Sequence, residues 1–229
     1  MTNDSAKILA VPAEELSGFY GRTNFYSDPA IVHNALEAIR NHGKFYLRKW
    51  AEETEIIRQV IPCAIVRNNT KLLCIRRAKK GRKDLRLRHT LLFGGHVDEE
   101  DSCDGRDCAL YRCVQRELRE ELGLSMTLSP IPIAVVVDIE TASSRRHFGV
   151  IFECQIEDDL VSVSKECDNA EFTRSGRNND YFLTEVGDFA GKKFDPWSQL
   201  FLTSHFARQN FAIPQSAFPT QLPLRLMLG

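Results

Sequence analysis

The chain has 229 residues and a mass of 26.1 kDa, with 43% hydrophobic and 27% charged residues. Such a chain can bury a full-sized core, and its length predicts one large domain or one domain with an appendage. The 30 Lys and Arg residues nearly balance the 31 Asp and Glu residues, which excludes a surface built throughout to hold nucleic acid.

Two further classes of protein are excluded by the distribution of apolar residues and cysteines. No stretch approaches the roughly 18 apolar residues of a membrane span, and the N-terminal sequence lacks a basic segment followed by an apolar core. We therefore expect a cytoplasmic protein without a membrane partner. The seven cysteines are scattered without a C-x-x-C pair, so we expect reduced thiols that fill small apolar spaces.

The N-terminal part of the chain gives one clear element. Residues 29 to about 41 are predicted to form a helix, because apolar residues recur at helical spacing behind Asp28 and Pro29. The first thirty residues show no regular pattern, and residues 44–58 are interpreted as a second helical or irregular segment. We therefore expect residues 1–57 to form a mainly helical N-terminal extension.

The main domain is expected over residues 58–229, beginning with two apolar runs, 60–66 and 71–77, that predict a β-hairpin. The elements expected after it are a short strand at 90–97, a helix at 107–122, strands at 131–139 and 147–156, a strand or short helix at 181–191, and a capped helix at 195–209. This irregular order favours an α/β/α sandwich with a mixed β-sheet over a doubly wound nucleotide fold.

The helix at 107–122 carries three glutamates on one face. Glu117, Glu120 and Glu121 stand at i, i+3 and i+4, within an arc of about 100°. Apolar residues on a neighbouring arc would anchor this face on the core. The carboxylates repel one another unless a cation sits among them, and oxygen ligands suit Mg²⁺ or Mn²⁺. A solvated helix face, paired with its own arginines, is the alternative.

The surrounding glycines decide between these alternatives. Gly94 and Gly95 end the strand before the helix, and Gly123 and Leu124 follow it. Residues 116–124, R-E-L-R-E-E-L-G-L, match the second half of the signature G-x5-E-x7-R-E-U-x-E-E-x-G-U, where U is a bulky aliphatic residue. This set resembles the Nudix box, and the resemblance implies the family's fold of helices flanking a mixed sheet over roughly residues 58–205.

The first half of the box departs from the family pattern. Arg116 follows Gly95 by 21 positions where the signature has 14, so about seven residues are inserted near 102–108. Counting forward from the glycine places the acidic position on Asp101, and counting back from the arginine places it on Cys108. We expect Asp101 to take this position. The other acidic residues that could turn inward are Glu99, Glu100, Asp104 and Asp107.

The resemblance also implies a reaction. Family members mostly hydrolyse a nucleoside diphosphate linked to another moiety, with divalent ions bridging the phosphates. By this resemblance, Glu117, Glu120 and Glu121 would hold Mg²⁺ or Mn²⁺ together with the backbone carbonyl near Gly95, and Arg116 would hold the glutamates in place.

Other residues are candidates for the acid–base step and for substrate binding. The base is not identified by spacing, and the candidates are Asp101, Glu166 and Glu171. The dense basic run at 76–89, with Arg76 and Arg77, would attract a substrate with several phosphates.

Each of these binding roles has an alternative. The basic run could be a solvated loop or an RNA-binding segment, although it has few aromatic residues for stacking. His96 would contact the substrate or make a structural hydrogen bond.

The leading hypothesis is therefore a Mg²⁺-dependent hydrolase that cleaves a phosphoanhydride bond in a small phosphorylated substrate, not in nucleic acid. Isomerisation of isopentenyl diphosphate would need a cysteine after the glycine pair, where His96 and Val97 stand. A ligand sensor or scaffold that lost turnover is the alternative from another class. Residues 1–57 would cap the active site, form a homodimer contact or cover a sheet edge.

Overall fold

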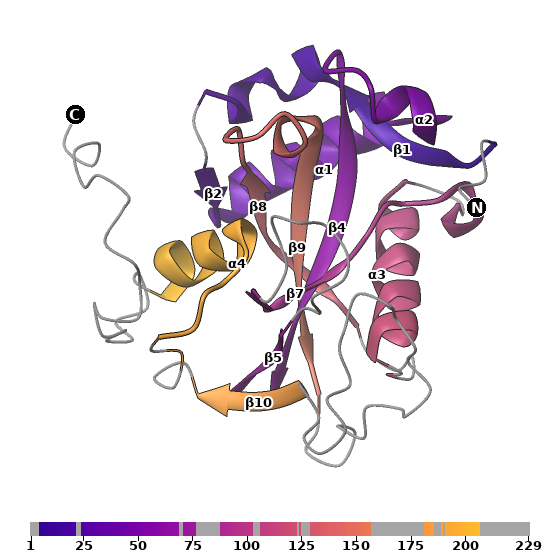
Figure 1. Ribbon diagram of the computed structural model, residues 1–229. Helices are drawn as coiled ribbons and strands as arrows, with labels where there is room; N and C mark the ends of the chain where they lie inside the picture. The colour runs from indigo at the N-terminus through magenta and orange to yellow at the C-terminus, as the bar shows by residue number, and fades with distance from the viewer. Residues whose placement is uncertain are drawn as a thin grey trace.

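One mixed β-sheet runs through the middle of the molecule (Figure 1). The computed structural model describes residues 5–21, 24–68, 71–76, 88–102, 106–122, 124, 129–156, 181–185, 189 and 191–206. The main path of the sheet has the order β10 (Tyr181–Glu185), β5 (Lys71–Arg76), β4 (Ile57–Asn68), β9 (His147–Gln155), β8 (Ile131–Val137) and β2 (Asn24–Tyr26). β4 and β9 are parallel and the other neighbours on this path are antiparallel, which confirms the predicted mixed sheet.

Further strands pair beside this path. β1 (Lys7–Pro12) pairs with β3 (Lys44–Leu47) and β4, β6 (His89–Thr90) pairs with β5, and β7 (Leu92–Gly94) pairs with β4. β4 is consequently buried on both faces, with Val60 and Ala64 in one apolar cluster and Ile61 and Cys63 in another. A strand covered on both sides has no need for polar alternation, which explains the continuous apolar run in the sequence.

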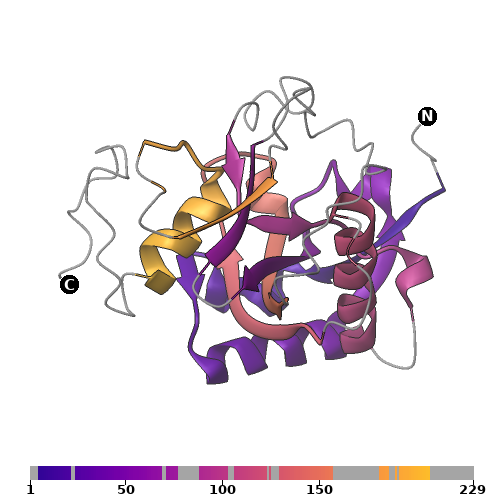
Figure 2. The same cartoon turned by 90° about the horizontal axis from the view of Figure 1, so that it is seen from below.

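Helices cover both faces of the sheet. α1 (Pro29–His42) and α3 (Arg106–Leu122) contribute to the cluster that contains Val60, whereas α4 (Pro196–Phe201) contributes to the cluster that contains Ile61. Figure 2 shows α1 and α4 on opposite sides of the central strands. The short elements are α2 (Arg48–Ala51) and the 3₁₀ turns η1 (Ala13–Phe19), η2 (Glu99–Asp101) and η3 (Ser144–Arg146). The predicted α/β/α sandwich is therefore confirmed.

The capped helices begin where the sequence predicts. The side chain of Asp28 accepts hydrogen bonds from the amides of Ala30 and Ile31, at 2.9 and 3.3 Å, at the start of α1. Asp195 does the same for Trp197 and Ser198 at the start of α4. α4 continues as a π-helical turn (Leu202–Phe206), and the end of the expected helix at 207–209 lies outside the described residues.

The N-terminal extension is part of the sheet. Besides the predicted α1, it supplies β1, β2 and β3, of which β1 pairs with β4 and β2 pairs with β8. The segment interpreted as helical or irregular, 44–58, contains β3 and α2. These strands are short and their partners are distant in sequence, so no local pattern indicates them.

Most of the described cysteines are buried free thiols. Cys63, Cys74, Cys113 and Cys154 are buried free thiols, as expected, whereas Cys108 is disulfide-bonded and corrects the expectation of reduced thiols throughout. Burial raises the pKa of Cys74 and Cys154 to about 12, so both stay protonated. In the described part of the chain, no helix is long and apolar enough to cross a membrane.

Candidate active site

Helix α3 presents its glutamates at three different depths. Val114, Leu118 and Leu122 are buried in the core, as the helical spacing predicts, and this fixes the rotation of the helix. Glu121 is consequently buried, the Glu117 side chain is 14% exposed and the Glu120 side chain is 57% exposed. The three carboxylates share one side of the helix but not one environment.

Arg116 is the centre of the charge network beside these glutamates. Its Nη1 donates to Glu117 Oε1 at 2.8 Å and to Glu120 Oε2 at 3.4 Å. Its Nη2 donates to the backbone carbonyl of His96 at 2.9 Å. Burial opposes the charge, but the hydrogen bond with Asp101 and the nearby acidic groups hold the pKa of Arg116 above its usual value. The network is therefore organised around a permanent cation.

Asp101, just before the insertion, pairs closely with Arg116, and Asp98 Oδ2 lies 3.6 Å from the same guanidinium. The two oxygens of Asp101 accept from Nε at 3.1 Å and from Nη2 at 2.9 Å, which is a bidentate pair. Oδ2 also accepts from the amide of Asp98 at the start of η2. Among the alternatives, Glu99 pairs with Lys7 at 2.9 Å and Cys108 is disulfide-bonded. Asp104 and the side chain of Asp107 lie outside the described residues.

Gly94 and Gly95 permit a close approach between α3 and the segment that ends β7 and enters the following loop, Gly95–Asp98. A Cβ on Gly95 would clash with the carboxylate of Glu117, and a Cβ on Gly94 would clash with the backbone of Pro62 in β4. Position 94 therefore requires glycine for space, whereas a side chain at position 95 would displace the carboxylate of Glu117. Burial raises the pKa of Glu117, and the Arg116 guanidinium offsets part of that effect.

His96 points away from α3 and into the fold. Its Nε2 lies 2.7 Å from Oε1 of Gln59, and its ring lies 5.8 Å from the ring of His147. Burial lowers the pKa of His96 to about 3, helped by the positive charges of Arg48, His147 and Arg116, so its imidazole is neutral at physiological pH. The nitrogen Nε2 is engaged by the protein itself.

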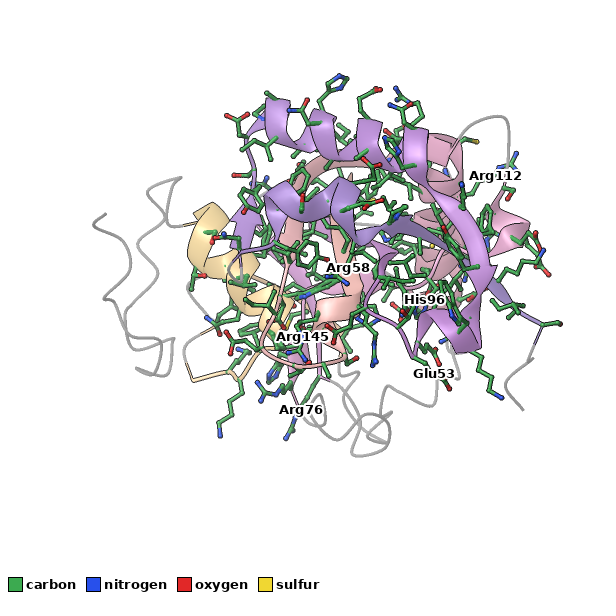
Figure 3. The ribbon with its side chains drawn as sticks, turned by 90° about the horizontal axis from the view of Figure 1, so that it is seen from above. Glu53, Arg58, Arg76, His96, Arg112 and Arg145 are labelled. Carbon is green, nitrogen blue, oxygen red and sulfur yellow. The ribbon has the colours of Figure 1, made fainter. Side chains whose placement is uncertain are left out.

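Of the remaining predicted residues, the structure describes only Arg76, and it lies away from this site. Arg76 ends β5 and is exposed, and Figure 3 shows it in a different part of the molecule from His96. Arg77, Glu166 and Glu171 lie outside the described residues.

The sequence did not predict a role in the site for two residues near the loop, Gln59 and Cys113. Gln59 is fully buried, and a polar residue inside an apolar run is the signal that could have indicated it. Cys113 had been interpreted as an apolar filler, but its Sγ lies 3.3 Å from the carbonyl oxygen of His96.

The donor set is suited to a hard divalent ion that keeps part of its water. The available groups are carboxylates of Glu117, Glu120 and Glu121 and the carbonyl of Gly95, which are oxygen ligands only. Within the described residues, no group of three or more His, Cys, Asp or Glu side chains is placed to hold a metal ion. An ion here would therefore take only some of its ligands from these groups and the rest from water and phosphate oxygens.

Comparison with known proteins identifies the family. The family model of the NUDIX domain matches residues 57–177, which is more than half of the chain. A sequence search of curated proteins finds no match.

One solved structure shares the fold over most of the chain, and two others are similar over part of it. The crystal structure of Tm1382, a protein assigned as a Nudix hydrolase, is similar over 88% of this chain and 99% of that chain, with a TM-score of 0.64 and 21% identity. MutT from Methanosarcina mazei Go1 matches 67% of this chain and 96% of its own, with 20% identity and a TM-score of 0.44. A MutT Nudix hydrolase from Burkholderia pseudomallei matches 63% of this chain and 95% of its own, with 17% identity and a TM-score of 0.47.

The family match covers the strand, loop and helix that bring Gly95, Arg116 and the glutamates together. The chain therefore belongs to the Nudix family, the hydrolases of diphosphate bonds.

Proposed function

We propose that the protein is a Mg²⁺-dependent hydrolase, with Mn²⁺ as an alternative ion, that cleaves the phosphoanhydride bond of a nucleoside diphosphate derivative or a similar small phosphorylated metabolite. The observation that carries this proposal is the packing of Glu117 against Gly95 under the control of Arg116. It brings a backbone carbonyl and carboxylates of α3 to one side of the sheet, where phosphate groups can be neutralised through an ion.

The glutamates have separate roles in this proposal. Glu117 and Glu121 are the buried carboxylates and would hold the ion with the carbonyl of Gly95. Glu120 is exposed and would face the ion from the solvent side. Such an ion lowers the pKa of a bound water and neutralises the diphosphate charge. Arg116 would keep the carboxylates apart from one another and correctly oriented.

The proton acceptor is proposed among three carboxylates. Asp101 already binds Arg116 through both oxygens, so taking a proton would cost it that ion pair. This geometry supports a positioning role for Asp101 and leaves Glu166 and Glu171 as the candidates for the base. Arg76 and Arg77 would attract the phosphates of the substrate. His96 lies next to the glycine pair and would support it through its hydrogen bond with Gln59. We place the enzyme in the cytoplasm.

The test is product release from a panel of nucleoside triphosphates, dinucleoside polyphosphates, ADP-ribose, nucleotide sugars and non-nucleotide diphosphates, with and without Mg²⁺. We expect turnover of at least one compound that needs the ion. Glu120→Gln should lower turnover by orders of magnitude while circular dichroism stays unchanged. Glu37→Gln is the matched control, because Glu37 pairs with Arg40 on an exposed face of α1.

Two results would contradict the proposal. Full activity of Glu120→Gln would contradict the proposed role of the glutamates in binding the ion. Absence of turnover with every compound, together with metal-dependent binding of one of them, would establish a ligand sensor instead.

A further inference from the structure

The loop Gly95–Asp98 lies between the end of β7 and η2 and carries the glycine on which the proposed site depends. It lies outside regular secondary structure apart from one bridge, so its shape depends on bonds to its surroundings. From α3, Arg116 Nη2 and Cys113 Sγ contact the carbonyl oxygen of His96, at 2.9 and 3.3 Å. These contacts hold one side of the loop.

The N-terminal extension holds the other side through its backbone. The amide of Leu9 in β1 donates to the carbonyl of Val97 at 2.9 Å, and Ile8 forms a β-bridge with Asp98. The loop is thus attached to β1 as a short additional strand. These bonds fix where the loop lies, and the carbonyl oxygen of Gly95 itself has one weak contact, with Cys113 Sγ at 3.7 Å.

A chain of side-chain hydrogen bonds also reaches the loop. The carbonyl oxygen of Ala51 at the end of α2 accepts from Nε2 of Gln59 at 2.7 Å. A carbonyl can only accept, so this bond orients the amide of Gln59 with Oε1 toward His96. Oε1 is likewise only an acceptor, and it lies 2.7 Å from Nε2 of His96. The hydrogen of the imidazole must therefore be on Nε2.

We propose that Gln59 and His96 are positioning residues: two hydrogen bonds connect α2 to the loop and help to hold the backbone carbonyl of Gly95 toward the reacting groups. The proposal concerns residues outside the glutamate helix, and its catalytic consequence rests on the proposed function. It also assigns a task to the N-terminal extension: β1 and α2 support the active-site loop from the side opposite α3.

We call the two hydrogen bonds that join Ala51, Gln59 and His96 the relay. Because Gln59 is buried, we expect the loss of one of these bonds to disrupt the whole relay. Gln59 is fully buried in β4, so loss of either partner leaves a buried amide group without its hydrogen bond. Removal of His96 or of Gln59 should therefore release the loop to the same extent.

The loop can be tested without any substrate or metal. Two amides report on it: the amide of Leu9 donates to the carbonyl of Val97 in the loop, and the amide of Asp98, the last loop residue, donates to the side chain of Asp101. We expect hydrogen exchange of these amides, measured by NMR relative to amides of β9, to become about tenfold faster in Gln59→Met and in His96→Leu. His96→Gln keeps a donor at a similar reach and should exchange nearly as slowly as the wild type.

The matched control is Ser198→Ala. Ser198 is also fully buried and its Oγ accepts from the amide of Leu91, but it lies in α4, in the other apolar cluster. This variant should leave the relative exchange of the Leu9 and Asp98 amides unchanged. Unchanged exchange in Gln59→Met or His96→Leu would overturn the proposal.

Two further results keep the proposal testable if a variant does not fold. The ¹⁵N chemical shifts of His96 in the wild-type protein should show the Nε2–H tautomer, and an Nδ1–H tautomer would overturn the relay. Where both single variants fold, the double variant should exchange no faster than either of them, because both substitutions break one relay. Additive effects would show two independent contacts.

Kinetics then separates positioning from substrate contact. The relay predicts that both variants lower kcat and raise the Mg²⁺ concentration for half-maximal rate, with little change in the substrate KM. A raised KM in His96→Leu alone would assign His96 to the substrate and overturn the positioning role. An inactive wild-type protein with the expected tautomer and exchange pattern would refute the proposed function and leave the relay intact.

Discussion

At the scale of single residues, Arg116 changes how the repulsion within the glutamate cluster is explained. Three carboxylates on one helix face repel one another unless a cation lies among them. The structure supplies a cation in the chain itself, because Arg116 contacts Glu117, Glu120 and Asp101. For Glu117 and Glu120, the electrostatic argument is therefore satisfied without a metal ion. The argument for an ion rests instead on the oxygen ligands beside Gly95.

The clash at Gly95 gives a sharp prediction at this scale. In Gly95→Ala the new Cβ would displace the carboxylate of Glu117, so we expect turnover to fall by about a hundredfold or more. Steady-state kinetics against the best substrate of the panel measures this. Gly18→Ala is the control, because a Cβ at Gly18 meets nothing within 4 Å, and it should keep full activity. Equal activity of the two variants would contradict the assigned approach of Glu117.

The buried His96 predicts a dependence of stability on pH. Its pKa is lowered from 6.5 to about 3 in the folded protein, so only the unfolded chain takes up this proton between those values. Its contribution is present above pH 6.5 and is lost as the pH falls toward 3, by at most about 1.4 kcal/mol for each pH unit.

Denaturant unfolding at a series of pH values checks this expectation. His96→Gln should lose stability less steeply than the wild type below pH 6.5, because glutamine does not titrate. His33→Gln changes an exposed histidine of α1 and should follow the wild-type curve. Parallel curves for all three proteins would contradict the burial of a neutral imidazole at position 96.

At the scale of elements, Trp197 makes a close contact between α4 and the sheet. A Cβ on Gly149 of β9 would lie 2.7 Å from Cζ3 of Trp197, so the tryptophan ring rests directly on the strand. The contact with Gly149 gives Trp197 a packing role.

Trp197→Ala should therefore destabilise the protein without removing activity. We expect the free energy of unfolding to fall by about 3 kcal/mol, as for other large aromatic residues at packed contacts. Trp50→Ala is the control, because Trp50 is 41% exposed, and it should cost less than about 1 kcal/mol. Chemical denaturation compares them, and equal losses would contradict the docking role of Trp197.

At the scale of the whole molecule, the sheet includes strands that precede the residues matched by the family model. The match starts at residue 57, whereas the first strand of the sheet starts at Lys7. Residues of β1, η1 and α1 enter the same apolar cluster as α3; they are Leu9, Val11, Leu16, Ala35 and Ile39. We propose that residues 1–57 and 58–229 fold as one cooperative unit.

Deletion of residues 1–57 tests this unit. The shortened chain would expose the cluster under α1 and leave β8 and the loop Gly95–Asp98 without their partners β2 and β1. We expect aggregation or loss of the near-ultraviolet circular dichroism signal, with no turnover. A folded and fully active 58–229 fragment would contradict both the cooperative unit and the support of the loop by β1.

The elements whose causes are local could be predicted from the sequence. Helix α3 with its glutamates, the caps Asp28 and Asp195, and the hairpin of β4 and β5 follow from residues within a few positions of one another. Tertiary structure alone decided that Asp101 meets Arg116 across 15 positions, that Gln59 meets His96 across 37, and that β1 supports the loop. These contacts depend on how distant segments pack against each other, and no periodicity or cap encodes them.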